Sequence, residues 1–235
     1  MFTVRHARPQ RIDPRDEPVY QLAEAAHYLA LPRSTLSAWL QGQRLQGRKH
    51  APALISPAQR KPVCLSFWNL VELYVLASMR RAHDVSMQRV RRAIAYVARE
   101  KRLDRPLIEQ DFLTDGVDLF VEEYAKLLNV SQSGQTAMRQ TLESSLKRIK
   151  RDERGLANRV FPWRHSPSDD PYDVEIDPTR CSGKPVLTGT GVVTGVLAER
   201  FFAGDSIDAL AADYGIAREK VEAAVRWEGA SVAEH

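Results

Sequence analysis

The sequence predicts a mainly helical α+β fold, with an N-terminal winged helix-turn-helix, a small middle α/β unit and a C-terminal three-helix unit that contains a second helix-turn-helix. Apolar residues recur at helical spacing over most of the chain, and short β-prone runs are bounded by Pro and Gly. The expected divisions are a flexible lead-in (1–17), a winged unit (18–103), the middle unit (104–164), a linker (165–172) and the helical unit (173–235).

The composition indicates a folded protein and argues against a membrane or secreted protein. The 235 residues are 43% apolar, enough for one large or two small folded units. No run approaches the roughly 20 apolar residues of a membrane span, and the N-terminus lacks the apolar core of a secretory signal. The only cysteines, Cys64 and Cys181, lack metal-ligand spacing. We therefore expect a cytoplasmic protein without a disulfide, a metal or a cofactor.

Charge is distributed unevenly along the chain. Residues 1–103 hold 18 Lys and Arg against 7 Asp and Glu, a net charge of +11, whereas residues 104–164 hold 10 of each sign. Residues 165–235 hold 6 basic and 13 acidic residues, a net charge of −7. A basic block is typical of polyanion binders, and an acidic block repels phosphate. The alternative is that the basic residues only solvate a surface.

The winged unit begins with two short helices. The first is expected from Tyr20, because apolar residues stand at helical spacing: Leu22, Ala25, Ala26 and Leu29. It ends before Pro32, since proline disfavours helix in the residue preceding it. A second helix is expected over Arg33–Gln41, followed by a hairpin of Leu54-Ile55 with Val63–Leu65, and by helices over 67–82 and 86–101.

The second helix carries the candidate DNA-reading residues. In a helix-turn-helix this helix enters the major groove. Its outward side chains can pair with bases or phosphates: Arg33, Ser34, Thr35, Ser37 and Gln41. Basic side chains on the following hairpin are expected to hold phosphates: Arg44, Arg48, Lys49 and His50. The alternative is an ordinary helical hairpin with a solvated face.

The middle unit is expected to be part strand. Ile108–Thr114 and Asp118–Glu122 flank the turn signal Asp115-Gly116, which favours a hairpin. Further expected elements are a strand at 126–130, a helix at 135–150 and a strand at 159–163. Acidic residues gather near the hairpin: Asp111, Asp115, Asp118, Glu122 and Glu123. A magnesium-dependent nuclease is therefore one alternative function.

The C-terminal unit is expected to open with a strand at 174–178. A glycine-rich turn leads from it to helices near 194–203, 206–213 and 217–228, of which the last two form a second helix-turn-helix. Because this region is acidic, packing or protein binding is favoured over DNA binding. The six histidines are scattered, and His27 is interpreted as a surface or capping residue. No cluster of titratable groups indicates an enzyme.

Two segments resemble known families. YQLAEAAHYLALPRSTLSAWLQG, the hairpin and LSFWNLVELYVL together resemble the winged helix of MerR regulators, although no long dimerising helix or cysteine-rich, ligand-binding tail follows. The pattern I-D-P-x4-G-K-P-x3-G-T resembles a small helical domain associated with antitoxins; its residues are Ile176, Asp177, Pro178, Gly183, Lys184, Pro185, Gly189 and Thr190.

Together the segments resemble a VapB-type antitoxin of actinobacteria. The resemblance implies that the protein neutralises a VapC-like PIN-domain ribonuclease and represses its own operon by binding operator DNA. We expect it to act as a dimer, because paired half-sites multiply affinity. The alternative is a stand-alone MerR-like transcription regulator without a toxin partner.

Overall fold

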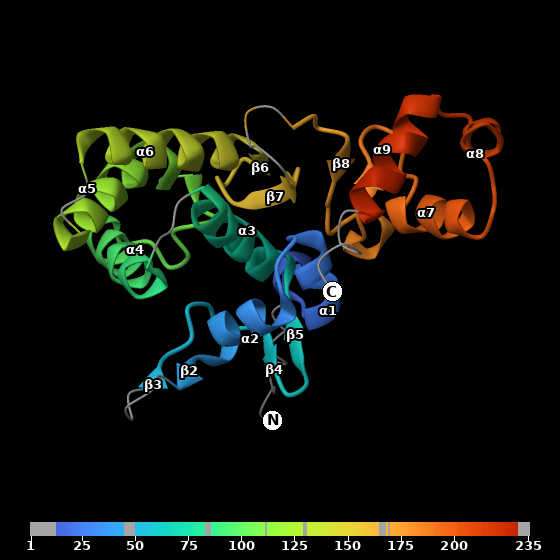
Figure 1. The fold of residues 1–235 in the computed structure, drawn as a ribbon. Helices are drawn as coiled ribbons and strands as arrows, with labels where there is room; N and C mark the ends of the chain where they lie inside the picture. Colours follow the sequence, from blue (N-terminus) through green and yellow to red (C-terminus); the bar gives the residue numbers. More distant parts are fainter. Residues whose placement is uncertain are drawn as a thin grey trace, which may run out of the picture.

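The computed structural model describes residues 13–44, 50–82, 86–110, 112–128, 131–164, 168 and 170–229. In these ranges the protein is mostly helical, and its short strands form four small sheets (Figure 1). None of the helices in these ranges is long and apolar enough to cross a bilayer. We call residues 18–103 the head and residues 173–229 the tail.

The head begins with the expected helix pair. Strand β1 (Tyr20–Gln21) leads into α1 (Leu22–Tyr28), which starts with a capping box: the Glu24 carboxylate accepts the Gln21 N–H at 2.8 Å. After the turn comes α2 (Arg33–Gln41), and Gly42 ends it with a φ of +80°. The two helices are thus confirmed, and a short 3₁₀ turn, η1 (Pro14–Asp16), precedes them.

The hairpins that follow α2 differ from the expected one. Strands β2 (Gln43–Arg44) and β3 (His50–Ala51) pair with each other, while β5 (Val63–Leu65) lies between β1 and β4 (Gln59–Arg60). The expected pairing of Leu54-Ile55 with β5 is therefore wrong. The N–H of Leu54 instead donates to the carbonyl of Trp39 at 2.6 Å, which satisfies an acceptor near the end of α2.

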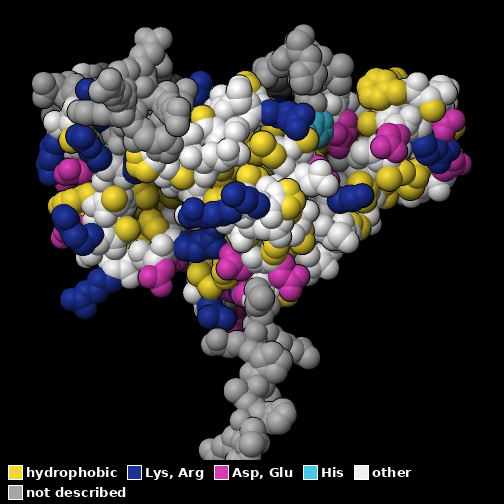
Figure 2. All heavy atoms as spheres, turned by 90° about the horizontal axis from the view of Figure 1, so that it is seen from below, with side chains coloured by type: hydrophobic (Ala, Val, Ile, Leu, Met, Phe, Trp, Pro, Cys, Tyr) yellow, Lys and Arg dark blue, Asp and Glu magenta, His cyan; other side chains and the backbone are white. Residues whose placement is uncertain are grey.

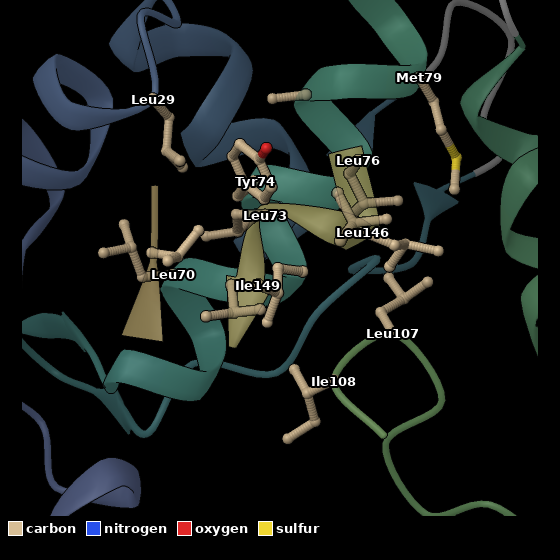
Figure 3. Close-up of a cluster of buried hydrophobic side chains, with 14 of the residues drawn as sticks. Leu29, Leu70, Leu73, Tyr74, Leu76, Met79, Leu107, Ile108, Leu146 and Ile149 are labelled. Atoms are coloured by element: carbon tan, nitrogen blue, oxygen red, sulfur yellow. The ribbon is translucent and has the colours of Figure 1, made fainter. Parts of the chain in front are cut away.

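Helix α3 (Phe67–Ala82) is the central element of the molecule, and its apolar side chains are almost completely shielded from solvent. On one side of it lie α4 (Met87–Lys101), α5 (Val117–Leu128) and α6 (Gln132–Lys147); α6 packs against α3, and α5 packs against α4 and α6 (Figure 1). Figure 3 shows α3 side chains packed together with residues of the other elements, among them Leu29, Leu107, Leu146 and Ile149. One continuous core therefore joins the head to the middle of the chain.

The expected hairpin at 108–122 and the strand at 126–130 are wrong. Residues Phe112–Gly116 form a π-helical turn that runs directly into α5. Burial follows a helical period along α5, at Val117, Phe120, Val121 and Tyr124. Gly116 is not a hairpin turn: a Cβ there would lie 2.8 Å from the ring of Phe112, so glycine allows that ring to pack closely.

Helix α6 ends three residues earlier than expected, and β6 (Ile149–Arg151) then pairs with β7 (Ala157–Val160). Between α6 and β6 stands Arg148, a fully buried arginine. Its guanidinium donates to the carbonyls of Phe161 (2.8 Å), Asp170 (2.8 Å) and Pro171 (2.9 Å). Residues 170–171, within the expected linker, are thus bonded to the middle unit.

The tail contains the three expected helices. Strands β8 (Val174–Glu175) and β9 (Val186–Leu187), with the 3₁₀ turn η3 (Cys181–Gly183) between them, precede α7 (Thr194–Phe202), α8 (Ile207–Tyr214) and α9 (Arg218–Gly229). Gly215 ends α8 in the left-handed conformation. The helices enclose a small core of their own: Leu187, Leu197, Leu210, Val221 and Ala224.

Candidate nucleic-acid interface

Helix α2 has one buried face and one open face. Leu36, Trp39 and Leu40 pack into the core. On the other side Arg33, Ser34 and Gln41 are exposed, and Thr35 and Ser37 are partly exposed. The sequence therefore folds so that all five of the predicted DNA-reading residues of α2 are accessible to a partner.

The expected phosphate-binding residues after α2 are only partly placed. Arg44 and His50 lie opposite each other on β2 and β3, so the backbone forms a hairpin directly after α2. The side chains of Arg44 and His50, and the whole of Arg48 and Lys49, lie outside the described residues.

Several arginines of the head lack a carboxylate partner. Within the described part of the chain, no ion pair involves Arg33, Arg80, Arg89, Arg91 or Arg92. Figure 2 shows Lys and Arg side chains spread across the face from which the small hairpins project. Unpaired guanidinium groups give this part of the surface a positive potential that attracts polyanions.

A groove of about 340 Å³ lies between α2 and α4. Its floor is apolar and includes Trp39, Leu54 and Met87, and Ser34 and Thr35 stand on the α2 side. Two arginines, Arg80 and Arg91, also line it. Arg91 is an addition to the predicted site, because it lies on α4 and is not among the expected DNA-reading or phosphate-binding residues.

The head and the tail are joined through aromatic residues. The Tyr20 hydroxyl donates to the carbonyl of Gly183 at 3.1 Å, and a Cβ on Gly183 would lie 2.2 Å from that hydroxyl. The ring of Trp227 lies 5.6 Å from that of His27 and 6.1 Å from that of Tyr28, between centroids. Burial raises the pKa of both Tyr20 and Tyr28 well above the ordinary tyrosine value.

His27 is not the surface or capping residue that the sequence indicated. Its Nε2 bonds to the carboxylate of Glu228 in α9, and the other oxygen of that carboxylate accepts from the Thr194 hydroxyl at 2.5 Å. The Arg164 guanidinium donates to the carbonyls of His27 (2.9 Å) and Trp227 (3.3 Å). These bonds fix α1 of the head against α9 of the tail.

The charged residues around the I-D-P motif have a structural role. Asp177 accepts bonds from the backbone and hydroxyl of Thr179 at 2.9 and 2.6 Å. The buried carboxylate of Glu175 pairs with Arg180 (2.6 Å) and Arg159 (3.2 Å). Burying a carboxylate is costly without such partners, so these groups hold one another in place.

The second helix-turn-helix, α8 and α9, has a different electrostatic character. Arg200 pairs with Asp205 and Asp213, both at 2.7 Å. Arg218 pairs with Glu222 at 3.0 Å and also with Asp208. The two guanidinium groups are thus neutralised within the tail and do not form an open cationic face.

The acidic residues of the middle unit do not form the expected hairpin. Asp118 lies in the first turn of α5 and pairs with Arg139 at 3.0 Å, while Asp111 and the side chain of Asp115 lie outside the described residues. Among the residues whose side chains are placed, no group of three or more His, Cys, Asp or Glu has the geometry to hold a metal ion.

Comparisons with known proteins support a DNA-binding domain in the head. Residues 18–94 match the family described as "Putative DNA-binding HTH domain", and residues 174–227 match "Protein of unknown function (DUF433)". The N-terminal unit is thus a helix-turn-helix domain of a DNA-binding type.

The full chain has mycobacterial relatives. It is 31% identical, over 89% of its length and 93% of the relative, to the Mycobacterium tuberculosis protein named "Putative antitoxin VapB45". The chain belongs to the family of that protein. A second protein of the same organism, "Uncharacterized protein Rv2308", is 27% identical over 90% of each chain. The crystal structure of Rv2018 from the same organism matches with a TM-score of 0.65 and 27% identity, over 89% of this chain and 98% of the other.

Proposed function

We propose that the protein is a cytoplasmic antitoxin of the VapB type, which neutralises a VapC-like PIN-domain ribonuclease and represses their shared operon. The observation that carries the proposal is the open face of α2, whose polar side chains and unpaired Arg33 belong to a helix-turn-helix. The family relationship to a protein named as an antitoxin supports the second activity.

In this proposal α2 lies in the major groove of operator DNA. Arg33, Ser34, Thr35, Ser37 and Gln41 contact base edges or nearby phosphates, and Arg can pair with guanine through two hydrogen bonds. The hairpin after α2 acts as a MerR-like wing on which Arg44, Arg48 and Lys49 hold phosphates. A homodimer would place two such helices on successive half-sites.

The tail is the proposed toxin-binding part. Its helices expose apolar side chains, including Phe202 at 65% and Val196 at 41% exposure. Its carboxylates would repel the phosphates of DNA. Unlike Lys or Arg, a carboxylate also releases no counterions from the duplex. DNA and toxin would therefore contact separate ends of the molecule.

The full-length protein tests both activities. A mobility-shift assay should show binding to the fragment upstream of its reading frame at a salt concentration where a scrambled duplex of equal length is not retained. When the protein is co-expressed with the product of the adjacent reading frame, the two proteins should copurify. The ribonuclease activity of that product should then be inhibited.

The two outcomes separate the candidate functions. Specific DNA binding without a copurifying ribonuclease would identify a stand-alone regulator instead of an antitoxin. Failure to bind any duplex at 50 mM salt would remove the DNA-binding assignment.

A further inference from the structure

Arg91 is a cation in an unusual position. It projects from α4 into the α2–α4 groove, where one of its terminal nitrogens donates to the carbonyl of Pro52. Its Nε is shielded from solvent and has no hydrogen-bond partner in the described structure. Partial burial lowers the pKa of this guanidinium.

The remaining lining of the groove is suited to an anion. Arg80 contributes a second guanidinium, which lies 6.0 Å from the Trp39 ring. Ser34 and Thr35 line the same space, and none of the described residues that line it is acidic. A desolvated cation is costly unless a counter-charge accompanies it. The groove therefore offers two positive charges and neutral donors to a ligand that supplies the negative charge.

Geometry favours a phosphate. A guanidinium matches two oxygens of a phosphate with parallel N–H donors, and such charge-assisted bonds are the stronger ones in proteins. The volume of about 340 Å³ is ample for a phosphodiester group. Ser34 and Thr35 belong both to the groove and to the proposed DNA-reading helix, so a duplex on α2 would pass beside its opening.

We propose that the α2–α4 groove holds one phosphate of the DNA backbone and that Arg91 is its anchor, an inference that rests on the proposed DNA binding. The contact is independent of sequence and fixes α2 in register on the duplex. The anchor Arg91 lies on α4 and not on the base-reading helix α2, so it contributes affinity without contributing base preference.

The test compares Arg91→Gln with Arg92→Gln, a matched loss of charge at the next position of α4, which does not line the groove. With the upstream fragment and with a scrambled duplex alike, Arg91→Gln should weaken binding about tenfold. It should also reduce the slope of log affinity against log salt by about one. Arg92→Gln should give a distinctly smaller change in both quantities.

A scan of neutral methylphosphonate substitutions along the duplex locates the phosphate. A methylphosphonate at one position should weaken DNA binding by the wild type and by Arg92→Gln. The same substitution should not weaken binding by Arg91→Gln any further. Because Arg91 also holds the Pro52 carbonyl, Arg80→Gln serves as a second variant, and thermal unfolding of both confirms that the fold is kept. The methylphosphonate at that position should weaken DNA binding by Arg80→Gln less than it weakens binding by the wild type.

Three results would overturn the proposal. If Arg33→Ala weakens DNA binding while Arg91→Gln and Arg80→Gln behave like Arg92→Gln, the groove is not a phosphate site and the DNA-binding function stands. If the wild type binds neither duplex, both proposals fail. If inorganic phosphate binds below 1 mM and duplex affinity is unaffected by Arg91→Gln, the groove takes a free anion and not the DNA backbone.

Discussion

Several arginines of the head and two arginines of the tail differ in their partners. In the tail, Arg200 and Arg218 each bond two carboxylates. In the head, Arg33 and Arg80 have no such partner among the described residues. Both ends contain a helix-turn-helix, so the fold alone does not distinguish them. An arginine that is not neutralised by a carboxylate attracts an external polyanion more strongly than a paired one does.

The same two regions are nevertheless one structural body. The core around α3 extends through Val174 and Ile176 to Trp227, and the tail adds only a small separate cluster. A difference in ion pairing thus coexists with a shared core. The predictions below test, first, how far head and tail depend on each other, and then how far their chemistry differs.

The largest expected effect follows from removing the Trp227 side chain. Trp227 is 7% exposed and packs on the rings of His27 and Tyr28. Trp227→Ala should lower the free energy of unfolding by about 3–5 kcal/mol in urea titrations. Phe202→Ala, an exposed aromatic of the tail, should cost far less. If Trp227→Ala lowered the urea midpoint for unfolding of the tail and left that of the head unchanged, the two regions would fold independently.

The next effect concerns DNA recognition. Arg33→Ala should reduce discrimination between the upstream fragment and a scrambled duplex by about 1–3 kcal/mol, because a bidentate contact to a base is lost. Arg218→Ala, the matched change at the start of the second helix of the tail's helix-turn-helix, should leave both affinities unchanged. Mobility shifts at fixed salt measure both. Equal losses in the two variants would contradict the contrast between the regions.

A smaller effect is expected at the Tyr20 hydroxyl. Tyr20→Phe removes the bond to the Gly183 carbonyl and should cost about 1 kcal/mol at pH 8. Since burial raises the Tyr20 pKa in the folded protein, the contribution of the neutral phenol is complete below pH 10 and is lost as the pH rises above it. The wild type should therefore lose stability above pH 10 more steeply than Tyr20→Phe. Parallel curves in urea unfolding at several pH values would argue against this.

The smallest effect is expected at the proposed wing. Lys49→Ala should weaken specific and non-specific duplexes by the same few-fold factor, because a phosphate contact does not read sequence. The slope of log affinity against log salt should fall by about one. If instead Lys49→Ala changed the preferred sequence, Lys49 would belong to the base-reading residues.

Much of the fold was predictable from local pattern. The helix pair of the head and the three tail helices follow from apolar spacing together with Pro32, Gly42 and Gly215, which act within a few residues. The middle unit differs from the expected one. The turn signal Asp115-Gly116 favours a hairpin, whereas Val117, Phe120 and Val121 have the spacing of a helix. Local turn chemistry and tertiary packing conflicted there, and packing prevailed.

The candidate site was predictable only in part. The open face of α2 follows from helical geometry, so the residues on it could be named in advance. The groove beside it depends on α4 approaching α2, and no spacing rule places Arg91 opposite Ser34. The pairing of His27 with Glu228 likewise joins residues 201 positions apart. Contacts of this kind arise from the tertiary fold and leave no local signature in the sequence.

The contact of Tyr20 with Gly183 has a consequence for the order in which the protein is made. The two residues are 163 positions apart, and synthesis proceeds at about 5–20 residues per second. After Tyr20 is added, about 8 to 33 seconds pass before its partner is joined to the chain. Throughout that time the aromatic side of α1 has no cover from the tail, so the nascent chain exposes apolar surface to chaperones and proteases. A chain that ends before residue 183 therefore lacks the partner of Tyr20 and leaves this side of α1 uncovered.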